Sequence, residues 1–155
     1  MDFPPIFERF TISQFSKTFF YTGKLFLKKK YGENKNWGYL EQSQYIESII
    51  LSHVLKGIVL KQRVNEFEFY DYIILDGYER VKTLHSFLNN NFSLRYLVNI
   101  PELNGFNYEK LSSEVPDILD CFSFSQLPIV IFPNHTPEKY LKLIYNKRNP
   151  VLWTI

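Results

Sequence analysis

The chain has 155 residues, of which 45% are hydrophobic and 22% are charged, a composition typical of a globular domain and not of a disordered segment. Its formal net charge of +2 does not indicate a nucleic-acid-binding surface, and its single cysteine excludes an intrachain disulfide framework and a cysteine-cluster metal site. No apolar stretch reaches membrane-spanning length, and the N-terminus lacks the basic and apolar regions of a signal peptide. We expect an intracellular soluble protein, in the cytoplasm or the nucleus, with no membrane association and with a single domain over residues 1–155 (core about 23–150).

The first 38 residues give few regular patterns. Residues 1–22 are aromatic and poorly periodic, so no element is assigned to them, and residues 25–27 are expected to form a short strand. The basic run Lys28-Lys29-Lys30 is either a phosphate contact or a solvated strand end, the second being the commoner case. Because the chain contains 15 Phe and 11 Tyr, we expect most aromatic side chains to pack in the core.

The next pattern predicts a helix over residues 40–56, which Gly57 is placed to terminate. The apolar side chains that share one face of this helix are Ile46, Ile49, Ile50 and Val54. His53 occupies a similar face and is expected to be buried with its hydrogen bonds satisfied.

Two extended runs follow, over residues 58–64 and 67–75, and Asn65-Glu66 between them predicts a hairpin with a polar turn. The second run ends in the apolar stretch 72–75, as expected of a strand that is buried on both faces.

The motif Asp76-Gly77-Tyr78-Glu79-Arg80 lies where this strand stops and a helical pattern starts. Such a junction can hold a phosphate, because glycine allows close approach of the backbone, the first N–H groups of the helix point at the ligand, and arginine adds a bidentate fork. The same residues also fit an ordinary strand-to-helix turn in which Asp76 caps the helix and Arg80 is solvated. The short motif alone favours this second interpretation.

The helix after the motif has one apolar face and is expected to end at Asn89-Asn90-Asn91. The residues on that face are Val81, Leu84, His85 and Leu88. His85 is therefore expected to be a mostly buried, satisfied histidine and not a catalytic one.

The remainder of the chain predicts short elements. They are an extended run at 92–97, a turn at Asn104-Gly105, helices near 108–112 and 117–122, a strand at 128–132, and a helix that starts at Thr136-Pro137-Glu138 and continues to about Lys147. Thr136 is the expected N-cap, Cys121 the expected small buried hydrophobe, and His135 is expected to be exposed. Helices interleaved with few strands, two of them in a hairpin, predict an α+β domain with a mixed sheet.

The order of these elements resembles the DGQQR-motif domain of GmrSD-type and related restriction systems, a member of the ParB/sulfiredoxin-like superfamily. The segments that carry the resemblance are Trp37, 44–51, 73–77, Arg80, 83–89, 103–111, 128–132, 136–138 and 144–149. It covers about residues 23–150 and implies the ParB/sulfiredoxin-like fold, an α+β mixed sheet with packed helices.

In that family the DGQQR segment is associated with nucleotide binding and hydrolysis, in proteins that restrict modified or foreign DNA. The resemblance therefore implies an NTP-binding domain associated with DNA processing, a nucleoside triphosphate with Mg²⁺ as cofactor, and a nucleic acid or a nuclease-bearing protein as partner. It implies nucleotide contacts from Asp76, Gly77, Tyr78 and Arg80, second-tier contacts from Lys147 and Asn149, and catalytic roles in a weak NTPase for Asp76, Glu79 and Arg80.

The chain departs from the family pattern at several positions. The two Gln of the motif are Tyr78 and Glu79 here, Lys147 replaces an Arg of the closing pattern, and an early Pro-x-x-Gln-Arg stretch is not recognisable, with residues 28–31 near its place. The sequence ends at Ile155 without the nuclease domain that usually follows, and its three histidines offer no metal-binding constellation. Independent nuclease activity is therefore not expected.

Two functions remain open at the level of the sequence. Retention of Asp76, Gly77 and Arg80 favours a nucleotide-binding module, whereas loss of both Gln favours a degenerate interaction module that keeps the fold without the site. Glu79 is either a general base or magnesium ligand, or an exposed first-turn glutamate favoured by the helix dipole. We find no nucleophile–base pair and no metal-ligand spacing, so direct DNA cleavage is the weakest alternative.

Overall fold

The computed structural model describes residues 4–29 and 36–147 and shows an α+β fold with a five-stranded mixed sheet. The chain forms two compact units. The sheet unit comprises Met1–Glu33, Lys56–Tyr78 and Leu127–Ile155, and the helical unit comprises Asn34–Leu55 and Glu79–Gln126. None of the described helices is long and apolar enough to cross a membrane. The expectation of one domain over residues 1–155 stays a prediction.

The sheet has the strand order β1-β5-β3-β4-β2. Its strands are β1 (Ile6–Thr11), β2 (Leu25–Lys29), β3 (Ile58–Val64), β4 (Tyr70–Asp76) and β5 (Gln126–Phe132). β3 pairs antiparallel with β4 and parallel with β5, while β2 pairs parallel with β4. The mixed sheet and the strands expected at 25–27, 58–64 and 128–132 are confirmed.

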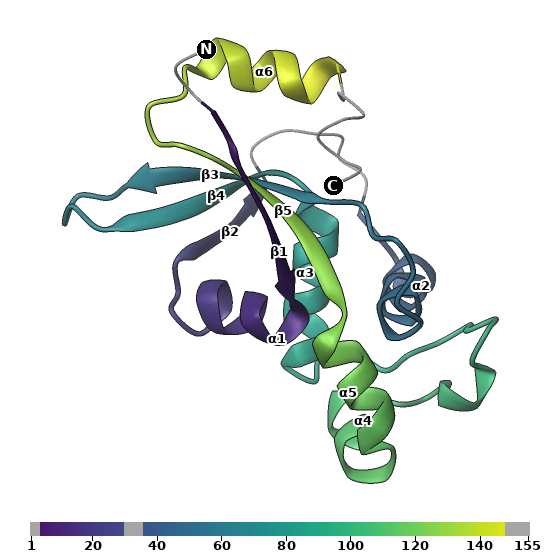
Figure 1. Ribbon diagram of the computed structural model, residues 1–155. Coiled ribbons are helices and arrows are strands. Elements are labelled where there is room, and N and C mark those ends of the chain that lie inside the picture. Colours follow the sequence, from purple (N-terminus) through teal and green to yellow (C-terminus); the bar gives the residue numbers. More distant parts are fainter. Residues whose placement is uncertain (1–3, 30–35, 148–155) are drawn as a thin grey trace. The chain divides into compact units, whose positions relative to one another are not determined.

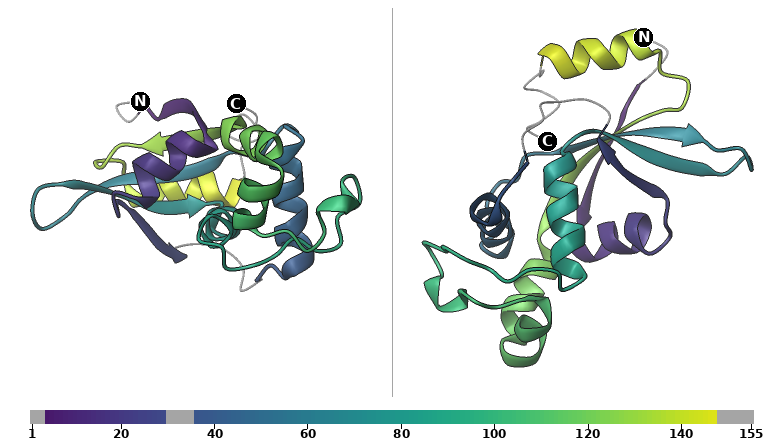
Figure 2. Two further views of the ribbon diagram at one scale, coloured as in Figure 1. Left: turned by 90° about the horizontal axis from the view of Figure 1, so that it is seen from below. Right: turned by 180° about the vertical axis from the view of Figure 1, so that it is seen from behind.

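Helices cover both faces of this sheet. α6 (Glu138–Lys147) lies over one face, and α1 (Ile12–Phe15) with the π-helix η1 (Ser16–Phe20) lies over the other (Figures 1 and 2). On the α6 side Leu141 joins a buried cluster with side chains from three strands, namely Val59, Ile73, Leu75, Val130 and Phe132. On the opposite face the rings of Phe19 and Tyr72 meet edge to face, with centroids 5.1 Å apart.

Burial of β4 on both faces is confirmed. Its three consecutive residues Ile73, Ile74 and Leu75 are all buried, and Ile74 is only 1% exposed. Because successive strand side chains point to opposite faces, such a run requires cover on both sides of the sheet.

The β3–β4 hairpin is confirmed, with a longer connection than the predicted two-residue turn. The Asn65 side-chain oxygen accepts hydrogen bonds from the N–H groups of Phe67 and Phe69 at 2.9 and 3.1 Å, and Glu68 takes a positive φ of 62°. The local hydrogen bonds of asparagine thus stabilise a five-residue loop from Asn65 to Phe69 between the strands.

The helical unit is built from α2 (Tyr39–Ile50), most of α3 (Tyr78–Leu88), the 3₁₀ turn η2 (Pro101–Leu103), α4 (Tyr108–Glu114) and α5 (Pro116–Phe124). The fully buried ring of Phe87 lies at its centre. Centroids of the Phe92 and Phe122 rings lie 5.4 and 5.6 Å from it. The segment between α3 and η2 forms no strand and is held by side chains of α2.

α2 ends six residues earlier than predicted. The N–H groups of Ser52 and His53 donate to the carbonyls of Ile49 and Ser48, both at 3.0 Å, and Ser52 takes a φ of 55°. This is the Schellman pattern that usually requires glycine, and it stops the helix well before Gly57. Consequently Val54 is 99% exposed instead of joining the apolar face, and His53 is exposed instead of buried.

Three further expectations are settled by local geometry. Asn90, with a φ of 62°, ends α3 by the same pattern, as predicted. Cys121 is exposed, so its prediction as a buried hydrophobe is wrong. Thr136 is buried and its Oγ1 has no hydrogen-bond partner among the described residues, so it does not cap α6 as predicted.

Ile74 tests the contribution of the sheet core to stability. Ile74→Ala should lower the free energy of unfolding by about 2–5 kcal/mol, because it deletes a large side chain from a buried position and leaves a cavity. Urea unfolding measures the effect, and Val54→Ala is the matched control that should change stability by less than about 0.5 kcal/mol. A loss of under about 1 kcal/mol for Ile74→Ala would contradict its burial.

Candidate functional site

The predicted junction of strand, glycine and helix is present. β4 ends at Asp76, Gly77 is buried with a φ of 98°, and α3 begins at Tyr78. A positive φ is strained for residues with a Cβ, which explains why glycine occupies this position. The boundary between the sheet unit and the helical unit falls directly after Tyr78.

The other predicted nucleotide contacts are placed only in part. Asp76 and Tyr78 are half-buried and flank Gly77. Lys147 is the last residue of α6, but its side chain lies outside the described part of the structure, as does the whole of Asn149. Their predicted contacts to phosphate or base therefore stay predictions.

Glu79 is half-buried in the first turn of α3. The expectation of an exposed first-turn glutamate is therefore wrong. Its Oε2 accepts a hydrogen bond from the backbone N–H of Trp37 at 3.3 Å. Its Oε1 is buried and has no hydrogen-bond partner among the described residues. Because a buried carboxylate oxygen without a donor is costly, this atom favours a cation nearby.

Arg80 is half-buried and lies close enough to Tyr45 of α2 for their charges to interact. Burial raises the pKa of the Tyr45 phenol above its usual range, and the positive Arg80 acts in the opposite direction. The Tyr45 hydroxyl and the Thr83 Oγ1 are both buried without a hydrogen-bond partner within the described residues. We call Tyr45, Glu79, Arg80 and Thr83 the α2–α3 polar cluster.

Sequence reasoning missed Tyr45, Thr83 and Trp37 as members of this region. A usable signal exists for Thr83, because it follows Glu79 by four residues and so shares a helix face with it. Trp37 reaches Glu79 across 42 positions of sequence, and its ring packs on Tyr45 with centroids 5.7 Å apart. No local pattern predicts contacts of that range.

A hollow of about 290 Å³ lies beside the polar cluster in the helical unit. Three aromatic side chains and three neutral polar ones line it: Trp37, Tyr39, Phe92, Gln42, Ser86 and Asn91. We call it the Gln42 hollow. Trp37 links the hollow to the polar cluster, since this residue lines the hollow and donates its N–H to Glu79.

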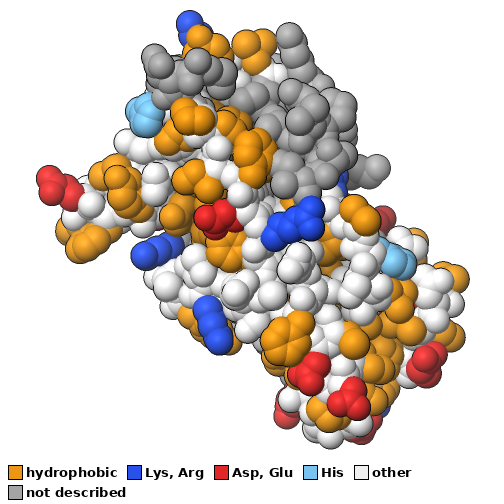
Figure 3. Space-filling view, in the orientation of Figure 1, with side chains coloured by type: hydrophobic (Ala, Val, Ile, Leu, Met, Phe, Trp, Pro, Cys, Tyr) orange, Lys and Arg blue, Asp and Glu red, His pale blue; other side chains and the backbone are white. Residues whose placement is uncertain are grey.

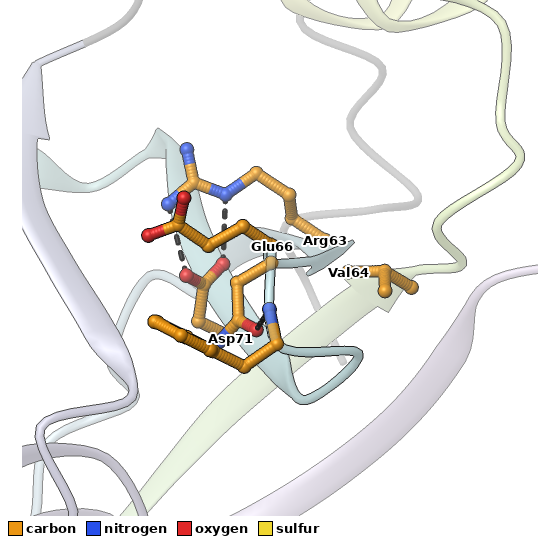
Figure 4. A pocket seen from close by; sticks show the side chains of 6 residues that line it. Arg63, Val64, Glu66 and Asp71 are labelled. Carbon is orange, nitrogen blue, oxygen red and sulfur yellow. Dashed lines mark hydrogen bonds and ion pairs between the residues drawn. The ribbon is translucent and has the colours of Figure 1, made fainter.

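A second hollow, of about 490 Å³, lies on the β3–β4 hairpin. Here Arg63 donates two hydrogen bonds to Asp71, from Nε at 2.8 Å and from an Nη at 2.9 Å (Figure 4). The hydrogen bonds to Asp71 raise the pKa of Arg63. The Asp71 carboxylate also neutralises the positive charge of Arg63, which would otherwise attract a phosphate. Hydrophobic side chains gather on the hairpin (Figure 3), where Phe67 and Phe69 are each 69% exposed. The hairpin hollow is thus a poorer anion site than the α3 N-terminus.

Among the described residues no group of three or more His, Cys, Asp and Glu could hold a metal ion. A magnesium ion at Asp76 or Glu79 would therefore have to complete its coordination with water and ligand phosphates, as Mg²⁺ commonly does.

Comparison with family models, with curated proteins and with solved structures finds no match to this chain. The resemblance to the DGQQR-motif family thus depends on the residues of this sequence alone.

The unsatisfied hydroxyl of Tyr45 gives a stability test of the polar cluster. Tyr45→Phe should raise the free energy of unfolding by about 1 kcal/mol, because it removes a buried polar atom that has no partner. Chemical denaturation measures the change, with Tyr39→Phe, whose ring is exposed, as the control. A loss of about 1 kcal/mol or more would show that the Tyr45 hydroxyl is hydrogen-bonded in solution.

Proposed function

We propose that the chain binds a nucleoside triphosphate, with its phosphates at the first turn of α3. The observation that carries the proposal is the junction itself, in which Gly77 at a φ of 98° connects the buried strand β4 to α3 and Arg80 follows three residues later. The resemblance to nucleotide-binding DGQQR domains supports the same assignment.

The chemistry of the turn suits an anion. The first N–H groups of a helix have no partners within the helix and carry the positive end of its dipole. Gly77 has no side chain to keep a phosphate from these groups, and the Arg80 guanidinium offers a bidentate fork to phosphate oxygens.

Glu79 makes the proposed site dependent on a divalent cation. Its carboxylate lies in the same helical turn as the anion-binding N–H groups and repels phosphate. Glu79, whose Oε1 is buried without a hydrogen-bond partner among the described residues, would hold a magnesium ion, and the positive charge of that ion would offset the repulsion of phosphate. Glu79 would then hold the metal or orient a water for slow hydrolysis, with Arg80 stabilising the developing charge.

The second candidate is a non-catalytic interaction module with the same fold. Glu79 favours it too, because the hydrogen bond from Trp37 gives this carboxylate a structural role without any ligand. Association with nucleic acid or with a nuclease-bearing protein is compatible with either candidate, and the binding of nucleotides separates them.

Arg80 provides the first test of nucleotide binding. Arg80→Ala should weaken binding of ATP, GTP or CTP by about 1.5–3 kcal/mol, roughly tenfold to a hundredfold, because it removes charge-assisted hydrogen bonds to phosphate. Arg80→Lys should recover only part of the loss, since lysine lacks the bidentate fork. Calorimetry with Mg²⁺ present measures the affinities, and Arg9→Ala, which alters an exposed arginine of β1, should bind as the wild type does.

The same titration distinguishes the two candidates. If the wild type binds none of these nucleotides at millimolar concentration, the chain is the interaction module. If Arg80→Ala binds as tightly as the wild type, the phosphates lie elsewhere.

Glu79 provides the test of cation dependence. Glu79→Gln keeps an oxygen that accepts the Trp37 N–H but removes the negative charge. Without Mg²⁺ the variant should bind the triphosphate about tenfold more tightly than the wild type, because the repulsion between carboxylate and phosphate is gone. Equal magnesium-free affinities would place the phosphates away from Glu79.

A further inference from the structure

The Gln42 hollow has the residues of a site for a flat, uncharged ligand. Of the residues that line it, three are aromatic, two carry a carboxamide and one carries a hydroxyl, and none is acidic or basic. Aromatic faces accept a planar ring by stacking, and carboxamides present a donor and an acceptor side by side. This combination matches the two features of a nucleobase, its π-face and its hydrogen-bonding edge.

Two of the aromatic residues that line the hollow, Tyr39 and Phe92, are held by contacts with other side chains. The Arg95 guanidinium lies 4.1 Å from the centroid of the Tyr39 ring, and the Arg95 N–H donates to Ser43 of α2 at 3.0 Å. Phe92 packs on the fully buried Phe87 with ring centroids 5.4 Å apart. Side chains held in this way bind a ligand without a large ordering cost.

The α3 residue that lines the hollow lies on the helix face that carries Glu79. Ser86 follows Glu79 by seven residues, which is nearly two turns, so both project from one side of α3. Seven residues correspond to about 10 Å along the helix axis. Trp37 spans this interval, since its N–H bonds to Glu79 while the residue also lines the hollow.

We infer that the Gln42 hollow binds the base of the nucleotide, with Gln42, Ser86 and Asn91 contacting the polar edge and the aromatic residues holding the ring. The link between base and phosphates rests on the proposed function, whereas the recognition of a base rests on the hollow alone. Nucleosides, which lack phosphate, therefore test the hollow, and inorganic tripolyphosphate tests the α3 N-terminus.

The experiment follows the indole N–H resonance of Trp37 by NMR, in full-length protein carrying Trp153→Phe so that Trp37 is the only tryptophan. Adenosine, guanosine, cytidine and uridine are titrated separately to millimolar concentration. We expect at least one nucleoside to shift the resonance saturably. Gln42→Ala and Ser86→Val should each weaken that binding about tenfold. The first variant removes a hydrogen bond to the base, and the second fills part of the hollow. Gln44→Ala, an exposed neighbour on α2 that does not line the hollow, should leave the affinity unchanged.

Three results would overturn the inference: no shift with any nucleoside, equal affinity in wild type, Gln42→Ala and Ser86→Val, or ribose alone binding as tightly as the nucleosides. Arg80→Ala should keep nucleoside affinity while losing tripolyphosphate affinity. Failure of tripolyphosphate to bind the wild type would remove the proposed phosphate site and leave the base assignment standing on the nucleoside data.

Discussion

Burial of three consecutive residues, Ile73 to Leu75, is the constraint that places the candidate motif. Ile73 and Leu75 belong to the cluster that Leu141 of α6 closes, whereas Ile74 points to the other face. A slip of one residue would exchange these faces, so the pairing of Ile74 with Leu60 of β3 is strongly specified. With this register β4 ends at Asp76, and Gly77, at a φ that other residues avoid, turns the chain into α3.

The helical unit depends on a different device, because the segment between α3 and η2 has no ladder of its own. The buried carboxylate of Glu47 accepts hydrogen bonds from the N–H groups of Asn99 and Ile100 at 3.0 and 3.2 Å and from the Asn99 side chain at 3.1 Å. Three donors for one carboxylate offset the cost of its burial. Glu47 therefore orders this loop together with Ser43 of α2, which accepts from the Arg95 N–H, and with two backbone hydrogen bonds of Leu94 to Gly105 and Phe106. The loop forms one side of the Gln42 hollow through Phe92.

Elements with strong periodicity or punctuation were predictable from the sequence, and long-range polar contacts were not. Three local signals with a physical basis allowed correct predictions: the apolar run 72–75, the asparagine of the hairpin and the end of α3 at Asn90. The capping box of Thr11 and Gln14 at α1 is also a local signal, but it was missed because residues 1–22 are aromatic and poorly periodic. The early end of α2 escapes such reasoning because Ser52 adopts the left-handed conformation that favours glycine. Glu47 escapes it because its partners lie 52 and 53 positions away.

Glu79 shows why a motif and its environment must be judged together. In the DGQQR pattern that this sequence resembles, the corresponding position is Gln, whose oxygen could also accept the Trp37 N–H. Glu and Gln at this position can both accept the hydrogen bond that joins the first turn of α3 to the segment before α2, and they differ only in charge. A carboxylate is stabilised by the helix dipole, so the fold tolerates the change well. At the proposed phosphate site, an anion would have to compete with that carboxylate or share a cation with it. The charge of the acceptor at this one position would thus decide whether the proposed site needs a metal.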